Sequence, residues 1–129
     1  MKKNIFLVLL ILLAACSAGQ MPSEYENLTS EQAVTALREM QELQVLDIRT
    51  LPEFKAGHIK GALNVDFYES SFRQGLEPLD KNATYLVYCR SGNRSAQSMA
   101  IFNELGFKKI LHMKKGIKDW AARGLPMVR

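Results

Sequence analysis

The feature that most constrains the fold is an alternation of short apolar runs with stretches of helical periodicity. Residues 84–88 read TYLVY, a run of β-branched and aromatic residues that predicts a strand. After Ser95, apolar residues recur at helical intervals as far as Gly106, which suits the C′ position of a helix. Residues 109–113 predict another strand. Strands joined through helices predict an α/β fold with a mainly parallel sheet.

The same patterns place the other elements of one domain without internal repeats. Thr29 and Gln32 have the spacing of a capping box, which marks a helix start. The remaining predicted elements are a helix near 30–40, strands over 43–48 and 62–65, a short helix or irregular segment within 67–79, and a last helix over 117–123. Gly124 and Pro126 are expected to close the last helix.

The N-terminus has the pattern of a targeting segment. Two lysines precede an apolar run over 5–15, which is shorter than the roughly 20 residues that span a bilayer as a helix. The run ends Leu-Ala-Ala-Cys and resembles the lipobox of bacterial lipoproteins. We therefore expect residues 1–15 to be a signal peptide, Cys16 to carry lipid, 16–24 to form a tether and 25–129 to form the domain. The alternative is an ordinary signal peptide with a chance cysteine.

The lipobox interpretation also predicts the location of the protein. It would be exported and anchored to a membrane through Cys16. Ser17 follows the cysteine in place of an acidic residue, so in a Gram-negative cell the expected site is the periplasmic face of the outer membrane. In a Gram-positive cell the same anchor would place the protein outside the cell membrane.

Charge and cysteine content narrow the functional classes. The formal net charge is +4, and loss of the two lysines at positions 2 and 3 lowers it by two, to +2. A nucleic-acid-binding protein carries a strongly basic face, so nucleic acid is not an expected partner.

Cys89 with the distant His58 and His112 lacks zinc-type spacing, and neither a metal nor a cofactor is expected. If Cys16 carries lipid, Cys89 has no disulfide partner.

One basic cluster remains in the C-terminal part of the chain. Its members are Lys108, Lys109, Lys114, Lys115 and Lys118. A solvated face is the favoured interpretation, because no aromatic residues interleave to form a stacking platform. In a tethered domain the alternative is a face turned toward anionic lipid headgroups.

Cys89 begins the segment CRSGNRS where the predicted strand ends, and the carboxyl ends of parallel strands form the ligand crevice. Gly92 permits a tight turn whose N–H groups, with the helix N-terminus, would bind an anion and lower the pKa of the Cys89 thiol. Arg90 and Arg94 carry planar, permanent charges suited to oxyanions. The substrate-binding candidates are Arg90, Ser91, Gly92, Asn93, Arg94 and Ser95. A merely structural Cys89 would leave the arginines and the glycine unexplained.

Three segments together resemble the rhodanese sulfurtransferases. They are CRSGNR at 89–94, LDIRTLPEFKAGHIKGALNV at 46–65 and GIKDWAARGLP at 116–126. Three motifs in the right order are more specific than the loop alone, and the resemblance covers roughly residues 25–126. It implies a five-stranded parallel sheet with helices on both faces, in which Cys89 cycles between thiolate and persulfide.

The resemblance implies transfer of a sulfane sulfur. The Cys89 thiolate would attack the outer sulfur of a donor such as thiosulfate, and sulfite would depart. An acceptor, which could be cyanide, a small thiol or a protein thiol, would then remove the sulfur. Such covalent catalysis in two half-reactions predicts ping-pong kinetics.

Three other functions stay open. A phosphatase or arsenate reductase uses a similar cradle but has its arginine six positions after the cysteine, whereas Arg94 is five positions after Cys89. A non-catalytic docking module would have no need of an activated thiol. Disulfide exchange normally uses a C-x-x-C pair, which this chain lacks.

Upstream residues are candidates for supporting the site. Asp47 and Arg49 are expected to form an ion-pair network at the active-site end of the sheet. His58 is interpreted as structural, because a thiolate held by a cradle needs no general base. Lys60 stands where the family commonly has proline, and Lys115 where it commonly has glycine. These departures bear on substrate preference more than on activity.

Overall fold

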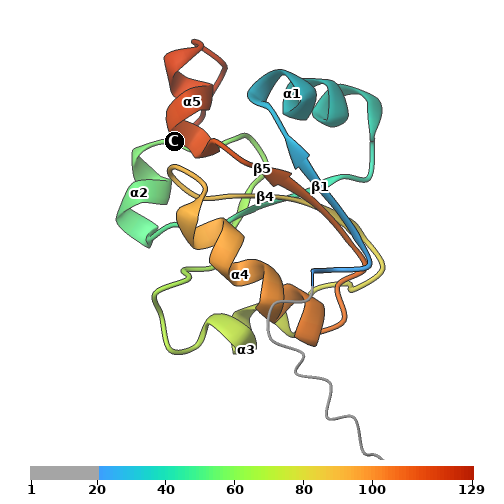
Figure 1. The fold of residues 1–129 in the computed structure, drawn as a ribbon. Helices are drawn as coiled ribbons and strands as arrows, with labels where there is room; N and C mark the ends of the chain where they lie inside the picture. The colour runs from blue at the N-terminus through green and yellow to red at the C-terminus, as the bar shows by residue number, and fades with distance from the viewer. Residues whose placement is uncertain (1–20) are drawn as a thin grey trace, which may run out of the picture.

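Five strands form one parallel sheet in the order β1-β5-β4-β2-β3. The computed structural model describes residues 21–129 (Figure 1). The elements are β1 (Glu24–Leu28), α1 (Ser30–Glu39), β2 (Gln44–Asp47), α2 (Leu51–Ala56), β3 (Leu63–Asn64), α3 (Phe72–Leu76), β4 (Thr84–Tyr88), α4 (Asn93–Glu104), β5 (Lys109–Met113) and α5 (Gly116–Ala122). The predicted α/β class and the five-stranded parallel sheet are confirmed.

The central strand is β4, which pairs in parallel with β2 on one side and β5 on the other. Four of its five residues are buried, as expected for a strand covered on both faces. Because all strands run in the same direction, their carboxyl ends lie along one edge of the sheet. Cys89 follows β4 at the middle of that edge.

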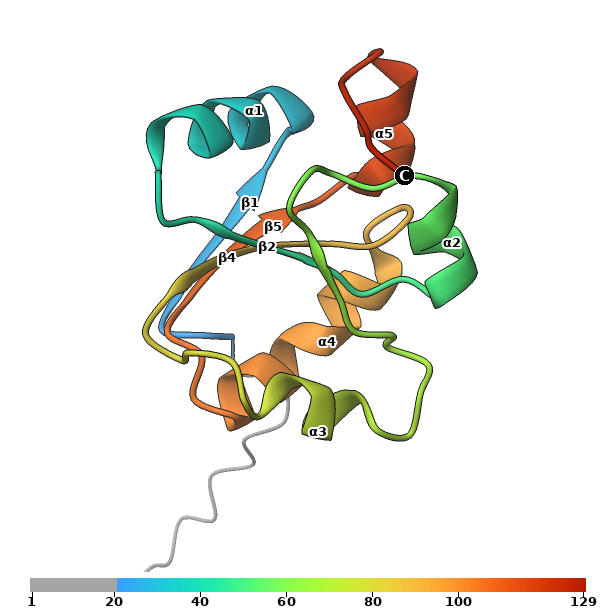
Figure 2. The ribbon, with the colours of Figure 1, turned by 180° about the vertical axis from the view of Figure 1, so that it is seen from behind.

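Helices cover both faces of the sheet. Figures 1 and 2 show α1 and α5 on one face and α3 and α4 on the other. The α1 and α5 face is filled by a cluster that includes Ala33, Leu86 and Trp120. The opposite cluster includes Phe102 of α4 and Phe72 of α3. Each helix thus packs its apolar side on a sheet that is apolar on both faces.

Two elements were missing from the sequence prediction. The strand β1 begins at Glu24, a residue that the prediction assigned to the tether, and it pairs with β5 along its whole length. Its sequence EYENL is mostly polar because it is an edge strand with exposed side chains. The helix α2 is only six residues long, but Thr50 and Glu53 cap it with reciprocal hydrogen bonds.

The predicted N-terminal features lie outside the described residues. These are the signal peptide over 1–15, the lipidated Cys16 and the first part of the tether. Within residues 21–129, no helix is long and apolar enough to cross a membrane.

Candidate active site

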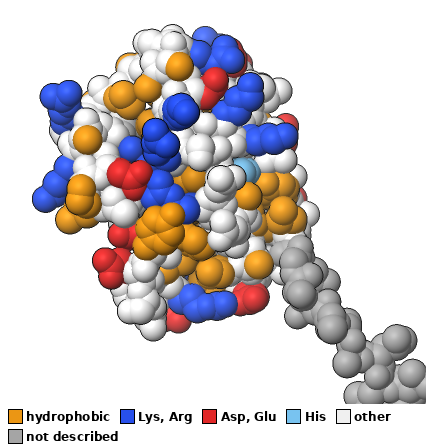
Figure 3. All heavy atoms as spheres, turned by 60° about the vertical axis from the view of Figure 1, so that its left-hand side comes forward, with side chains coloured by type: hydrophobic (Ala, Val, Ile, Leu, Met, Phe, Trp, Pro, Cys, Tyr) orange, Lys and Arg blue, Asp and Glu red, His pale blue; other side chains and the backbone are white. Residues whose placement is uncertain are grey.

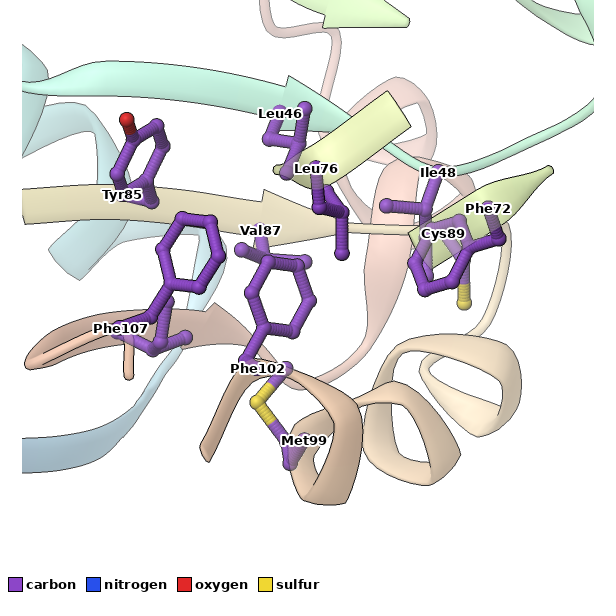
Figure 4. Packing of buried hydrophobic residues seen from close by; sticks show 11 residues of the cluster. Leu46, Ile48, Phe72, Leu76, Tyr85, Val87, Cys89, Met99, Phe102 and Phe107 are labelled. Carbon is purple, nitrogen blue, oxygen red and sulfur yellow. The ribbon is translucent and has the colours of Figure 1, made fainter. Parts of the chain in front are cut away.

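Cys89 lies at the start of a tight loop between β4 and α4. The residue is only 1% exposed and packs beside Ile48 and Phe72 at the end of the apolar cluster (Figure 4). The first turn of α4 follows the loop, so the partial positive charge of this helix end lies beside the sulfur. The thiol is therefore buried and close to oriented backbone dipoles.

The loop surrounds the sulfur with hydrogen-bonding groups. The Gly92 N–H donates to Cys89 Sγ over 3.1 Å, and Ser95 Oγ lies 3.3 Å from the same atom. Burial alone would raise the pKa of the Cys89 thiol. The Ser95 hydroxyl and the backbone N–H groups of Ser95, Gly92 and Ser91 oppose burial, and the pKa is lowered overall. The arrangement favours the nucleophilic thiolate.

Glycine at two positions allows this loop to lie close to the turn after β5. Gly92 has a φ of 98° and Gly116 a φ of 67°, both in the left-handed region. A Cβ at Gly92 would lie 1.9 Å from the Lys114 carbonyl oxygen, and one at Gly116 would lie 2.2 Å from that of Arg90. Glycine is therefore required at both positions. Lys115, where the family commonly has glycine, has a φ of −93° and needs no special residue.

The two candidate arginines of the loop differ in their surroundings. The Arg94 guanidinium donates to Glu53 of α2 through two bonds of 2.8 and 2.9 Å. It also lies 5.1 Å from the ring centroid of Tyr68. The Glu53 carboxylate thus already binds Arg94, and the pair lowers the pKa of Glu53 to about 2. Arg90 is exposed, and its side chain forms no ion pair within the described part of the chain.

The supporting candidates lie at the same edge of the sheet but do not touch the sulfur. Arg49 Nη2 lies 2.6 Å from Asp47 Oδ2 and donates to the Gly57 carbonyl over 2.7 Å. This buried ion pair ties the end of β2 to the residue after α2. His58 stacks on the Phe54 ring at 3.7 Å, and its Nδ1 lies 2.8 Å from the Phe54 carbonyl oxygen. Its bonds are structural and do not involve Cys89.

Sequence reasoning missed one member of the site, His112. Its Nε2 lies 2.6 Å from Ser95 Oγ, and its Nδ1 lies 2.9 Å from both Asn27 Oδ1 and the Tyr25 hydroxyl. A chain of hydrogen bonds therefore runs from Cys89 through Ser95 to this buried imidazole. Burial, together with the positive charge of Lys114, lowers the pKa of His112 to about 4.

Basic side chains surround the loop. Figure 3 shows Lys and Arg side chains gathered on the face that carries α5 and the start of α4. A cavity of about 340 Å³ is lined in part by Arg90 and Lys118, and another of about 430 Å³ in part by Lys114 and Lys115. We call these four residues the basic rim. No group of three or more His, Cys, Asp or Glu side chains that could hold a metal ion occurs within residues 21–129.

Comparison with known proteins identifies relatives of this chain. Residues 30–123 match the rhodanese-like domain family. A sulfurtransferase of Allochromatium vinosum is 34% identical over 99 residues, which cover 77% of this chain and 91% of that protein. The thiosulfate sulfurtransferase GlpE of Pseudomonas putida is 34% identical over 100 residues, covering 78% and 88%. The crystal structure of a rhodanese-related protein from Thermoplasma volcanium superposes with a TM-score of 0.70 at 28% identity, covering 81% of this chain and 98% of that one.

Proposed function

Because this chain belongs to the rhodanese-like domain family, whose members include sulfurtransferases, we propose that it moves a sulfane sulfur through a persulfide on Cys89. The donor is a small anion such as thiosulfate, and the acceptor is cyanide or a thiol. One observation carries the proposal. Cys89 Sγ lies within hydrogen-bond distance of the Gly92 N–H and the Ser95 hydroxyl, and the loop lowers the pKa of this buried thiol.

In the first half-reaction, the Cys89 thiolate attacks the outer sulfur of the donor. A new sulfur–sulfur bond forms at Sγ while the bond between the two donor sulfurs breaks, and sulfite leaves with that electron pair. The persulfide carries the negative charge on its outer sulfur. The helix end and the loop N–H groups stabilise this charge as they do that of the thiolate.

In the second half-reaction, the acceptor attacks the outer sulfur of the persulfide. The bond to Sγ breaks, and its electron pair returns to Cys89 as thiolate. Cyanide would leave as thiocyanate and a thiolate as a persulfide. Because the leaving group is the cradled thiolate, the same N–H groups that activate Cys89 in the first step also favour its departure in the second.

Burial and charge support a small anionic donor. With Cys89 only 1% exposed, a compact reagent reaches the sulfur more easily than a bulky one. The cations of the basic rim, none of which forms an ion pair within residues 21–129, attract a dianion. A phosphatase has its arginine six positions after the cysteine, and this chain has Ser95 there. This spacing weighs against the phosphatase and arsenate-reductase alternatives.

The test is the intact mass of the purified protein before and after exposure to thiosulfate, beside Cys89→Ser. We expect the wild type to gain one sulfur atom, the variant to gain none, and cyanide to remove the added sulfur. If wild-type protein with a titratable free thiol and an intact fold gained no sulfur, thiosulfate would be rejected as the donor. Equal gain in the variant would reject Cys89 as the sulfur carrier.

We also propose that the protein is exported and attached to a membrane through lipid on Cys16, which lies outside the described residues. The basic start, the short apolar run and the Leu-Ala-Ala-Cys sequence support this proposal. In the native host, Cys16→Ser should move the protein from the membrane fraction to the soluble fraction. A wild-type protein that is already soluble after fractionation would contradict lipid attachment.

A further inference from the structure

The Ser95 hydroxyl has one proton but three neighbours that could accept it. They are Cys89 Sγ at 3.3 Å, His112 Nε2 at 2.6 Å and the Gly92 carbonyl oxygen at 3.1 Å. The Gly92 oxygen already accepts the N–H of Ala96. The position of this proton decides whether Ser95 acts as a donor or an acceptor toward the sulfur. The ring of His112 in turn constrains that position.

The hydrogen-bond partners of His112 Nδ1 determine which of the two ring nitrogens carries the proton in this structure. The Tyr25 hydroxyl donates to Asn27 Oδ1 over 2.7 Å, so its oxygen and Oδ1 both face Nδ1 as acceptors. Nδ1 must then carry the ring proton, and Nε2 accepts the proton of Ser95. Ser95 is left as an acceptor toward sulfur, and a Cys89 thiol can donate its S–H to it. Every polar group of the thiol state has a partner.

The thiolate requires the opposite polarity. Ser95 must turn its hydroxyl proton toward Cys89 Sγ, and its oxygen then needs a donor, which a ring proton on His112 Nε2 supplies. The emptied Nδ1 can accept from Tyr25, whose hydroxyl oxygen lies 2.9 Å away. Only hydrogen atoms move within this chain. Asn27 Oδ1 then no longer accepts a hydrogen bond from the Tyr25 hydroxyl. Because Asn27 is exposed, it can accept one from water instead.

We infer that His112 is a positioning residue that turns the Ser95 proton toward or away from the sulfur by exchanging a proton on Nδ1 for one on Nε2 as Cys89 ionises. On ionisation Ser95 passes its proton to Nε2 and takes up the proton of Cys89, while Nδ1 releases its proton to water. The network as a whole loses one proton, and His112 stays neutral. Histidine suits this task because its neutral ring offers one donor and one acceptor that can exchange. The inference rests on the proposed role of Cys89 as the nucleophile.

The surroundings of the ring keep it neutral in both states. Tyr25 from β1, Lys114 and Lys115 after β5 and Cys89 through Ser95 are the titratable groups around it, and Arg94 on α4 adds a positive charge near the sulfur. No carboxylate of residues 21–129 bonds to either ring nitrogen. Burial and the charge of Lys114 lower the pKa of His112 to about 4. An imidazolium is therefore disfavoured at neutral pH, which leaves the two neutral tautomers.

The test is nitrogen NMR of the protein labelled with ¹⁵N in its histidine rings, recorded across the titration of Cys89 without any sulfur donor. Protonated and unprotonated ring nitrogens have well-separated shifts. We expect His112 to pass from mainly Nδ1-protonated to mainly Nε2-protonated with a midpoint equal to that of Cys89 alkylation. A ring that keeps one tautomer through the Cys89 titration, or that becomes doubly protonated, would overturn the inference.

Matched controls separate this linkage from a structural role. His58, whose Nδ1 is held at the Phe54 carbonyl, should keep its tautomer in the same spectra. Ser95→Ala breaks the chain between sulfur and ring, so His112 should no longer respond to Cys89. Cys89→Ala should likewise abolish the change while the fold, seen in the same spectra, persists. If His112 still changed tautomer in Cys89→Ala, the linkage would be rejected, whatever the outcome of the sulfur-loading experiment.

Discussion

Glu53 and Arg94 are 41 residues apart in the chain and form a two-pronged ion pair with bonds of 2.8 and 2.9 Å. The carboxylate belongs to α2 and the guanidinium to the first turn of α4. Their pairing therefore joins the two segments that flank the Cys89 loop. Glu53 is itself held by the backbone N–H and the hydroxyl of Thr50. The capping box of a six-residue helix thus orients a residue of the site.

Removing the Glu53 charge should destabilise the fold in a pH-dependent way. The pKa of Glu53 is lowered to about 2, mainly by Arg94. The ionised carboxylate therefore stabilises the fold fully above pH 4.5, its ordinary pKa, and this stabilisation is lost as the pH falls toward 2. We expect Glu53→Gln to lower the free energy of unfolding at pH 7 by about 1 kcal/mol. The deficit should shrink between pH 4.5 and 2, as measured by urea denaturation. Glu42→Gln, at an exposed carboxylate that forms no ion pair with any other residue of 21–129, should show no deficit.

The Ser95 hydroxyl should control the ionisation of Cys89. It is the leading favourable contribution to the lowered pKa of the thiol, against the opposing effect of burial. Ser95→Ala should therefore move the pH profile of alkylation by iodoacetamide to higher pH. Ser98→Ala removes a buried hydroxyl three residues along the same helix, which bonds to the Ser95 carbonyl, and should leave the profile unchanged. Coincident profiles for the wild type and Ser95→Ala would refute this role of Ser95.

Gly92→Ala should damage the loop much more than an ordinary glycine replacement. The new Cβ would lie 1.9 Å from a backbone oxygen, in addition to the strain of a left-handed φ. We expect a loss of at least ~3 kcal/mol in the free energy of unfolding, with loss of sulfur loading. Gly106→Ala has a similar φ of 85° but open space around the Cβ, and should cost only about 1 kcal/mol. If Gly92→Ala and Gly106→Ala lowered the free energy of unfolding equally in urea denaturation, the close contact of residue 92 with the turn after β5 would be unimportant.

The basic rim should accelerate reaction with an anionic donor. Neutralising Lys118 in Lys118→Gln removes one charge beside the loop, and we expect kcat/KM for thiosulfate to fall about two-fold at low salt. The difference should fade at high salt because screening weakens the attraction. Lys108→Gln changes a lysine just before β5, at the end of the sheet opposite Cys89, and should leave kcat/KM unaltered. A salt-independent loss in Lys118→Gln would point to a structural effect instead.

Much of the architecture was predictable because it depends on local patterns. The strands β4 and β5 have the predicted limits, and the capping box at Thr29 and Gln32 starts α1 as expected. The edge strand β1 escaped prediction because its polar sequence carries little apolar periodicity, and its partners in β5 are 85 residues away. The helix α2 was missed although Thr50 and Glu53 have the same spacing as the first capping box.

The sequence by itself determined the strands β4 and β5 with the helix between them, the position of Cys89 after a buried strand and the need for glycine in its loop. These features depend on neighbouring residues, whose periodicity and backbone preferences act locally. Only the tertiary structure decided that Arg94 pairs with Glu53 and that His112 reaches Ser95. Such pairs form because the parallel sheet aligns the carboxyl ends of separate strands and the adjoining helix ends. That alignment depends on register and packing across the whole domain, which no local pattern encodes.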